Sequence, residues 1–516
     1  MKQLRRYGIG VKQGVHGVSK FGVKLSHGRF RFRKSVPLKG GKEHIYFLSI
    51  LKIYMAEAFS ESLQYESVKR RAVASRSFKV KINPSNGNSF TAGNTIDISL
   101  PGNLAGQYYV PEQMFLKFRV RNTNAIQLDR AGAASMIKRC QITSAGSTLY
   151  DLNNYNVLAT ALMDTDCTAD WKASSGNVLM GTLGDQLQGE ALGAGSTRTY
   201  CVPLMLNPLS MTTPTRMIPA FSLSSLNYRV TLAADAEVGV SAGGTALVYD
   251  EVQMVALMCE LSPGAQSQID QMTGGQYNIL ANSYINSQAT LAAGVSSLTA
   301  NLGVSVSSLE RIIVVHRPSA TANAAAAFSL GNRTTSDLTE FQFLINSENY
   351  PATAIKVDDK GAETYAELLI ADHALTSFSK GNCLLNGFAR GTATQAPADT
   401  APLGTGALSG NAPGIVKNDC FRQLDGAGTS AGAVAENTIA VSSNVGTFLC
   451  ACEFESGISN GKSSHIYSGI STISSVVQYK GTYDAGQAAA NVDFFAQHTI
   501  LISLNMRTSG VYAVSV

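Results

Sequence analysis

The sequence predicts an all-β protein built from two tandem jelly-roll sandwiches, a double jelly roll, with a few short helices and long loops. Three observations support this prediction. Apolar residues alternate with polar ones through many short segments, which is typical of strands with one buried face. A series of strand, loop, hairpin and short helix occurs twice, about 200 residues apart. Long polar stretches separate the strands, and among β-sandwiches the jelly roll accommodates such insertions well.

The first half opens with strands whose apolar residues recur at every second position. Charged or hydroxyl-bearing residues occupy the positions between them, so we expect one face of each strand to be buried. The apolar sets are Phe78, Val80 and Ile82; Ile96, Ile98 and Leu100; Leu116, Phe118 and Val120; and, further along, Leu226, Tyr228, Val230 and Leu232.

Residues 139–163 combine a hairpin with a helix. Ile142 starts a short strand, Ala145-Gly146-Ser147 has turn chemistry, and an apolar pattern continues beyond it. The helix that follows is expected to begin at a cap formed by Asn153 or Asn154. Its apolar stripe consists of residues spaced i, i+3, i+4 and i+7, namely Tyr155, Leu158, Ala159 and Leu162.

Residues 171–195 are expected to form a polar loop, and 252–261 the last strand of the first half. Ser262-Pro263-Gly264 marks a break in the pattern. The predicted domains are a basic N-terminal arm or upstream extension at 1–54, a lead-in at 55–76, a first jelly roll at 77–262, a linker at 263–275, and a second jelly roll at 276–516 with a Gly/Ala-rich insertion near 390–437.

The second half repeats the order of the first. Residues 309–317 take the place of the strand at 114–121, a hairpin turns at 346–349, and 363–375 have helical spacing. At the end of the chain, Ile500, Ile502, Leu504 and Met506 alternate with polar residues before a turn at 507–510 and a returning strand. The repeat lies in the order of the elements, because the two copies share little sequence.

The composition favours a protein that covers much of its surface with neighbouring copies. Charged residues make up 15% of the chain, against about 25% in typical globular domains. Residues 1–42 contain twelve Lys and Arg and no acid, so the remaining chain holds 41 − 12 = 29 basic residues against 36 acidic ones. The arm is therefore basic and the body acidic, which predicts an arm that meets a polyanion.

The arm is expected to be disordered or to fold only on a partner, since its Gly- and Val-rich repetition has no core-forming period. Basic residues alternate there with Phe30 and Phe32, a pattern that can neutralise phosphates while the rings stack on bases. The candidate nucleic-acid-binding residues are Arg5, Arg6, Arg29, Arg31, Arg33 and Lys34. Met55 also resembles a natural start, so residues 1–54 could equally be an upstream extension absent from the working protein.

Catalytic and metal motifs do not stand out. The seven histidines do not form a ligand pattern such as HExxH, and the eight cysteines lack a CxxC pair and are expected to be reduced. Cys450 and Cys452 would point to one face of a strand as small buried residues. The GxSxG match at 428–432 lies in a low-complexity stretch and lacks the strand and helix that flank a catalytic serine. Asp164, Asp166 and Asp170 lack the Gly and Glu of an EF-hand, so we interpret these three aspartates as part of a solvated loop. We therefore expect no catalytic residues, no metal and no cofactor.

Several phrases of the sequence resemble the major capsid proteins of tailless double-stranded DNA viruses, especially the virophage, polinton-like and adintovirus branch. These are QITSAGSTLYDLNNYNVLATAL, VPLMLNPLSMTTPTRMIPAFSLSSLNYRVTLA, SSLERIIVVHR and VDFFAQHTILISLNMRTSGVYAVSV, and the resemblance spans about 77–516. It implies a non-enzymatic double jelly roll that self-assembles into trimeric pseudo-hexagonal capsomers of an icosahedral shell. The implied partners are neighbouring capsomers, other capsid proteins such as a penton, and viral nucleic acid through the arm. The basic arm and the long Gly/Ala loop depart from that lineage.

Two alternatives remain at the level of sequence. The first is one jelly-roll shell domain followed by a projecting β-domain, with the basic arm holding the genome of a small icosahedral virus. The second is a secreted β-sandwich lectin or hydrolase. That alternative requires a signal peptide and a pair of catalytic acids, and the sequence shows no sign of either. No apolar run reaches the roughly 20 residues of a membrane helix. The expected location is the virion, and the host cytoplasm or nucleus during assembly.

Overall fold

A computed structural model describes most of the chain beyond residue 74 and a few short strands before it. The described residues are 10–13, 19–22, 24–25, 28–29, 75–144, 146–183, 188–204, 206–210, 216–223, 226–241, 246–319, 328–331, 333–357, 361–375, 448–455, 469–484, 487–505 and 510–515. The chain divides into two compact units, Met1–Ala72 and Val73–Val516. In the first unit, strand β1 (Gly10–Gln13) pairs with β2 (Ser19–Gly22), and β3 (Lys24–Leu25) with β4 (Gly28–Arg29).

The first half of the second unit contains two large antiparallel sheets. One has the strand order β13-β8-β17-β5, with β14 beside β8 and β6 beside β17, and the other has the order β11-β10-β15-β7. The first comprises β5 (Ser75–Ile82), β6 (Ser89–Thr91), β8 (Gln107–Asn122), β13 (Thr197–Pro203), β14 (Ile218–Pro219) and β17 (Leu247–Leu261). The second comprises β7 (Thr95–Leu100), β10 (Ile137–Ser144), β11 (Ser147–Asn153) and β15 (Leu226–Leu232).

The second half contains another pair of antiparallel sheets. Their orders are β18-β25-β20-β23, with β26 beside β25, and β19-β24-β21-β22. The first comprises β18 (Gln276–Leu291), β20 (Leu309–Pro318), β23 (Cys450–Glu453), β25 (Ala490–Asn505) and β26 (Gly510–Ser515). The second comprises β19 (Ser297–Asn301), β21 (Leu338–Ile345), β22 (Glu348–Lys356) and β24 (Val477–Tyr483).

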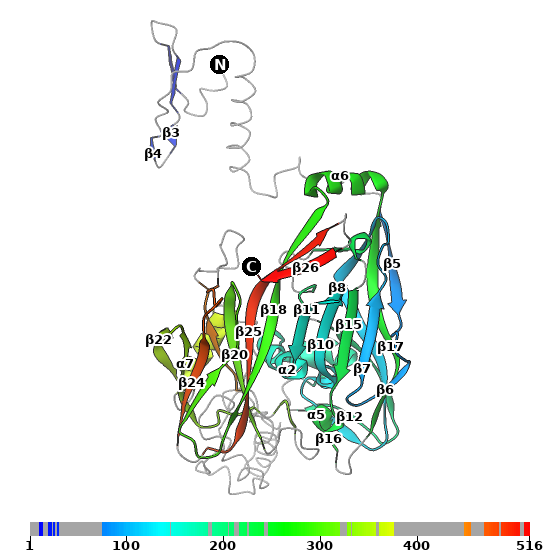
Figure 1. Ribbon diagram of the computed structural model, residues 1–516, viewed down its shortest axis with the longest axis vertical. Coiled ribbons are helices and arrows are strands. Elements are labelled where there is room, and N and C mark those ends of the chain that lie inside the picture. Colours follow the sequence, from blue (N-terminus) through cyan, green and yellow to red (C-terminus); the bar gives the residue numbers. More distant parts are fainter. Residues whose placement is uncertain are drawn as a thin grey trace, which may run out of the picture. The chain divides into compact units, whose positions relative to one another are not determined.

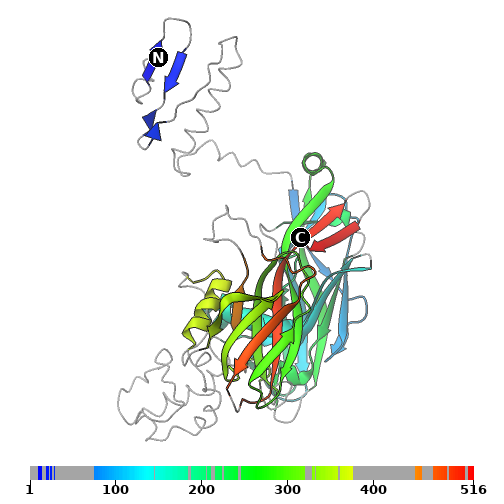
Figure 2. The ribbon, with the colours of Figure 1, turned by 60° about the vertical axis from the view of Figure 1, so that its left-hand side comes forward.

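The two halves have the same topology. The eight main strands of one half can be matched in chain order with the eight of the other. This matching turns both sheet orders of the first half into those of the second. The first half contributes β5, β7, β8, β10, β11, β13, β15 and β17, and the second half β18, β19, β20, β21, β22, β23, β24 and β25. Each half is an eight-stranded jelly roll, and the halves lie side by side (Figure 1). Figure 2 shows the strands of the second half from another direction. The predicted double jelly roll is confirmed, and the alternative of one jelly roll with a projecting domain is wrong.

The alternation seen in the sequence produces the core. In β15 and β7 the apolar residues are buried and the residues between them are less buried or exposed, as the pleat requires. Aromatic rings pack in both cores. The ring centroids of Phe118 and Tyr249 are 5.8 Å apart in the first half, and those of Tyr479 and Phe494 are 4.9 Å apart in the second. The predicted strand positions from Ile96 to Leu100 and from Leu226 to Leu232 are confirmed.

The hairpin and helix occur in both halves. Helix α2 (Tyr155–Asp166) follows the edge strand β11, and α7 (Ala362–Ala371) follows the matching edge strand β22. The strand before the first turn begins at Ile137 and not at Ile142. The expected apolar stripe is also wrong, because α2 is buried on all sides from Tyr155 to Thr165.

Other connecting segments are more regular than expected. The predicted polar loop at 171–195 contains the end of one short helix, all of a second short helix and a short strand. The predicted break after Ser262 is a helix, α6, whose first turn is capped by the Ser262 hydroxyl accepting from the Ala265 N–H. The remaining elements are η4 (Gly132–Met136), α3 (Ala169–Ala173), α4 (Ser175–Met180), η5 (Ala220–Ser222), α5 (Asp235–Val238), α6 (Pro263–Thr273), and a small sheet of β12 (Gln188–Leu192), β9 (Ile126–Asp129) and β16 (Gly239–Val240).

The final strands pair as predicted, since β26 runs back antiparallel along β25. The Gly/Ala-rich insertion near 390–437 lies outside the described residues. Among the helices of the described residues, none is long and apolar enough to cross a membrane.

Candidate functional site at the junction of the two halves

A buried carboxylate joins the two jelly rolls. Asp164 lies in the last turn of α2, and its Oδ1 accepts from Arg130 Nε at 2.8 Å and from Lys172 Nζ at 2.6 Å. Its Oδ2 accepts from Arg333 Nη2. Arg130 precedes η4 in the connection from β8 to β10, whereas Arg333 lies in the matching connection from β20 to β21. The pair between Asp164 and Arg333 therefore crosses from the first half to the second.

The four charged side chains of this cluster are almost completely buried, with at most 2% of any of them exposed. Burial by itself raises the pKa of Asp164, but the charges of Arg130, Lys172 and Arg333 outweigh it and hold the pKa well below its usual value. Asp164 is therefore ionised at neutral pH. The sequence interpretation of a solvated loop is wrong for Asp164, although Asp166 and Asp170 are exposed.

Asp129 makes a second contact between the matching connections. Its carboxylate accepts from the backbone N–H groups of Leu330 and Gly331 in the second half, each at 2.8 Å, and from that of Arg130 at 2.7 Å. Burial raises the pKa of Asp129 to about 6, and the backbone donors oppose that rise. A fully buried acid thus holds the loop of the second half against the first.

Asp493 on β25 is the centre of a third contact. Its Oδ2 accepts from Arg317 Nη2 at 2.7 Å, and its Oδ1 accepts from Gln288 Nε2 at 2.6 Å and from Asn154 Nδ2 at 3.0 Å. Asn154 precedes α2 in the first half, with a left-handed backbone at φ 51°. It occupies the predicted cap position, but its side chain reaches the second half and makes no capping hydrogen bond.

Helix α6 is tied to both halves by one polar group. Gln266 accepts from the hydroxyl of Tyr108 on β8 at 2.7 Å and donates to that of Tyr277 on β18 at 3.1 Å. Phe221 packs edge-on against both tyrosine rings, at 5.4 Å and 5.7 Å between centroids. Together with the three carboxylate contacts, this group fixes the second jelly roll against the first.

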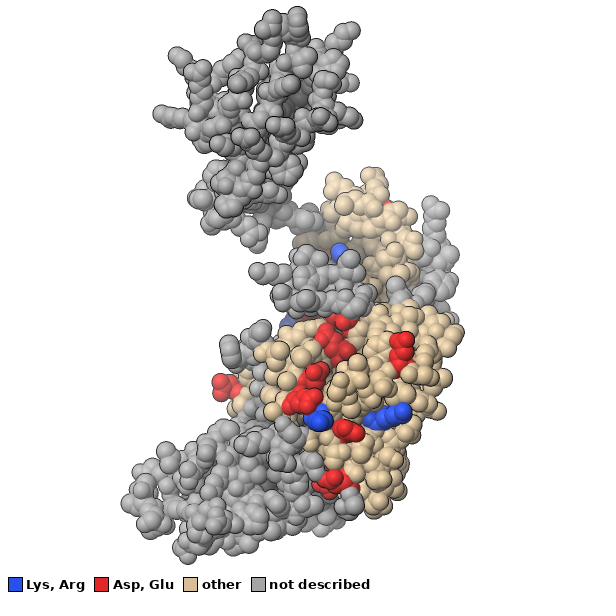
Figure 3. Space-filling view, turned by 90° about the vertical axis from the view of Figure 1, so that its left-hand side faces the viewer, with Lys and Arg blue, Asp and Glu red and all other residues tan. Residues whose placement is uncertain are grey.

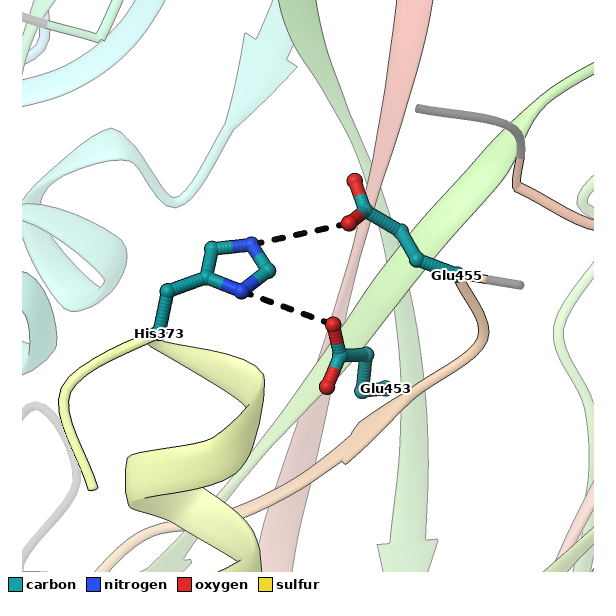
Figure 4. A group of neighbouring side chains, drawn as sticks. All are labelled: His373, Glu453 and Glu455. Atoms are coloured by element: carbon teal, nitrogen blue, oxygen red, sulfur yellow. Dashed lines mark ion pairs between the residues drawn. The ribbon is translucent and has the colours of Figure 1, made fainter. Parts of the chain in front are cut away.

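A separate cluster lies in the second half, where α7 meets β23. The ring of His373 sits between two carboxylates, with Nδ1 3.5 Å from Glu453 Oε1 and Nε2 3.7 Å from Glu455 Oε2 (Figure 4). Burial raises the pKa of Glu455 to about 7, and the charges of Glu310 and Glu453 add to the rise. The imidazole forms ion pairs with both glutamates only when it is protonated. One ligand atom from each residue also lies within 4.8 Å of the others, close enough to share a divalent cation.

Some of the cysteines and histidines considered in the sequence analysis lie in the described parts of the chain. Cys450 and Cys452 are buried with free thiols, as predicted from their spacing. His316 and His498 are also buried, and neither belongs to a group of potential metal ligands in the described parts of the chain. The GxSxG match at 428–432 and the side chains of Arg5, Arg6, Arg29, Arg31, Arg33 and Lys34 lie outside what the structure describes.

Sequence reasoning missed both clusters. The partners of Asp164 are 34, 8 and 169 residues away from it, and His373 is separated from the two glutamates by the long insertion. The one available signal was a charge next to an apolar segment: Asp164 directly follows Ala161-Leu162-Met163, whereas a solvated stretch would be polar throughout.

Comparison with known proteins supports the fold. No family model matches the chain, and no curated protein matches it in sequence. Among solved structures, it is similar to VP54 of PBCV-1, as fitted into a cryo-EM reconstruction of the virophage Sputnik, with a TM-score of 0.54, 10% identity, and coverage of 88% of this chain and 99% of that one. It is also similar to the Faustovirus major capsid protein, with a TM-score of 0.51, 10% identity and coverage of 89% and 97%. The chain has the fold of double jelly-roll capsid proteins over nearly their whole length.

Proposed function

We propose that this chain is a viral major capsid subunit and that three copies form a pseudo-hexagonal capsomer of an icosahedral shell. The observation that carries the proposal is the duplicated jelly roll, with the same strand order in both halves. Three copies of such a chain place six similar sandwiches around a three-fold axis. Six-sided units of this kind can tile the flat faces of an icosahedral shell, and the five-fold vertices between the faces need a different unit.

The junction between the halves supports this role. A capsomer keeps its outline only if the two sandwiches of each subunit stay at a fixed angle. The buried contacts of Asp164, Asp129 and Asp493 each have partners on both sides of the junction, and a shift between the halves would leave buried charges or donors without partners. The polar junction thus makes one relative placement of the sandwiches strongly preferred.

The surface is also suited to repeated contacts between copies. Figure 3 shows one side of the molecule, where most of the described surface is neutral and acidic side chains, several of them adjoining, outnumber basic ones. Contacts between such surfaces use many moderate hydrogen bonds and bury few charges, which avoids the cost of desolvating unpaired ions. A structural protein that works by assembling needs this kind of surface and no catalytic group.

Size-exclusion chromatography with light scattering tests the proposal. We expect the purified chain to elute with three times its monomer mass of 54.5 kDa, and larger shells or sheets to form at high concentration. A chain that remains monomeric at micromolar concentration would count against a capsid subunit. Negative-stain images of the trimer fraction should show six-sided particles.

The basic arm supports a finer part of the same proposal, that the subunit also contacts viral nucleic acid. The support is the charge asymmetry, with twelve basic residues and no acid in residues 1–42. A filter-binding assay should show salt-sensitive retention of DNA by the full chain and much weaker retention by a chain that begins at Met55. Equal and salt-insensitive binding by both would overturn this part. We also propose that a penton protein occupies the vertices of the shell. Assembly would take place in the host cytoplasm or nucleus.

A further inference from the structure

The cluster where α7 meets β23 brings three potential metal ligands together. His373 follows the end of α7, Glu453 is the last residue of β23, and Glu455 lies two positions further along the chain. Figure 4 shows the imidazole ring between the two carboxylates. One ligand atom from each of the three residues lies within 4.8 Å of the others. Side chains from two separate segments of the second half therefore converge on one point.

The distances in this cluster are close to those of a tetrahedral metal site. Zn²⁺ binds imidazole nitrogen and carboxylate oxygen at about 2.0–2.2 Å, which places neighbouring ligand atoms about 3.4 Å apart. Nδ1 of His373 lies 3.5 Å from Oε1 of Glu453, and Nε2 lies 3.7 Å from Oε2 of Glu455. Since one ion binds only one of the two ring nitrogens, the glutamate beside the other nitrogen has to move its carboxylate by roughly 1 Å. A rotation of that side chain is enough.

The surroundings of the cluster are short of positive charge. Burial raises the pKa of Glu453 and that of Glu455, the charges of neighbouring carboxylates add to both rises, and the charge of Arg311 opposes them. Arg311 itself already forms an ion pair of 2.9 Å with Oδ1 of Asp372. Oδ2 of Asp372, one residue from His373, is buried without a hydrogen-bond donor. Crowded carboxylates of this kind are stabilised by a cation that they share.

We propose that His373, Glu453 and Glu455 form a binding site for a divalent transition-metal ion of the zinc class. One imidazole nitrogen and two carboxylates are ligands that Zn²⁺ accepts, whereas Mg²⁺ and Ca²⁺ prefer sites made of oxygen alone. The side chain of His373 is 41% exposed, so the ion can enter from the solvent. The ion holds together two segments that are 453 − 373 = 80 residues apart in the sequence. This inference does not depend on capsid assembly, and it holds or fails for the isolated chain.

Zinc content tests the proposal on the full chain. We would strip the protein with EDTA, remove the chelator, dialyse the protein against micromolar Zn²⁺ in the presence of millimolar Mg²⁺, and measure the bound zinc by elemental mass spectrometry. Histidines and cysteines elsewhere can also take up zinc, so the result is the difference between variants. We expect His373→Ala and Glu453→Gln each to bind about one equivalent less than the wild type. Both side chains are partly exposed, so the folded chain tolerates their replacement.

Glu367→Gln is the matched control. It removes a carboxylate whose charge acts on Glu453, but it removes none of the three ligands, and it should keep the zinc content of the wild type. Equal zinc in the wild type and both ligand variants would show adventitious binding elsewhere and would overturn the proposal. A loss in Glu367→Gln as large as that in Glu453→Gln would also overturn it, because local charge and not coordination would then hold the ion.

Co²⁺ gives a second readout that does not depend on the variants. In a tetrahedral site with a nitrogen ligand it should produce visible absorption bands in the wild-type chain, and added Zn²⁺ should remove them. Mg²⁺ or Ca²⁺ at the same concentration should leave the bands unchanged; their removal by Ca²⁺ would contradict the zinc class. If a ligand variant does not fold, wild-type protein that shows no such bands overturns the proposal, and bands that Zn²⁺ alone removes support it.

Discussion

Replacing Asp164 with asparagine should strongly destabilise the protein although it changes only one atom in shape. The substitution removes the only negative charge that pairs with Arg130, Lys172 and Arg333 in the ion pairs of the described residues, and it places an amide NH2 against side chains that are themselves donors. Three buried cations are then left without the carboxylate that pairs with them. Because the three cations have at most 2% of their side chains exposed, water cannot replace the lost carboxylate.

The expected magnitude follows from the geometry. Breaking a buried ion pair by removing one partner costs about 3–5 kcal/mol, since an uncompensated charge stays buried. Here two of the three pairs have N to O distances of 2.6 and 2.8 Å, and the third is a hydrogen bond from Arg333. Part of the loss is offset because the carboxylate no longer has to be desolvated. We therefore expect the free energy of unfolding to fall by about 4 kcal/mol.

Urea unfolding measures this loss with a local and a global signal. Trp171 is the only tryptophan and precedes Lys172 in α3, so its fluorescence reports on the cluster, while circular dichroism follows the sheets. Asp166→Asn is the matched control, because Asp166 lies at the end of the same helix and is exposed. It should change stability by no more than about 0.5 kcal/mol.

The pKa of Asp164 gives an independent check. Because it lies below the value in the unfolded chain, the carboxylate contributes stability above pH 4, and that contribution is lost as the pH falls further. The difference in stability between the wild type and Asp164→Asn should therefore be constant from pH 8 to about 5 and shrink below about 4. If Asp164→Asn and Asp166→Asn have equal stability at pH 7, the account of the buried cluster is wrong.

Three further predictions concern buried groups elsewhere. Asp493→Asn should lower the free energy of unfolding by about 3 kcal/mol, because Arg317 loses its buried partner; a loss within 0.5 kcal/mol would contradict this. Burial lowers the pKa of His316 to about 3, so the neutral ring favours folding and this contribution is lost as the pH falls below about 6.5. The urea midpoint of His316→Phe should therefore depend less on pH between 7 and 5 than that of the wild type, and parallel curves would refute the assignment. Burial raises the pKa of the Cys452 thiol to about 12 and that of Cys450 well above its usual value, so mass spectrometry should find iodoacetamide adducts at both only after unfolding; labelling of the native protein would contradict this.

Much of the fold could be predicted from local patterns. The alternation in β7, β15 and β25 identified strands because a pleated strand places every second side chain on the same face. The hairpin with its following helix, recognised twice, led to the duplicated jelly roll, and the matching places of α2 and α7 confirm it. These features depend on residues close together in the chain.

Tertiary contacts decided the rest. The spacing in α2 predicted one buried face, yet the helix is enclosed on all sides because other parts of the chain cover its polar positions as well. His373 lies beside Glu453 and Glu455 only in the folded chain, because the three residues are far apart in the sequence. From the sequence we interpreted Asp164 as part of a solvated loop. The residues adjacent to it in the chain do not indicate that it pairs with Arg130 and Arg333. The sequence by itself determined the strands and their repetition, because hydrophobic period is a local property. Which charges are buried, and with which partners, was decided by the packing of the two halves, because ion pairs form between residues that only the fold brings together.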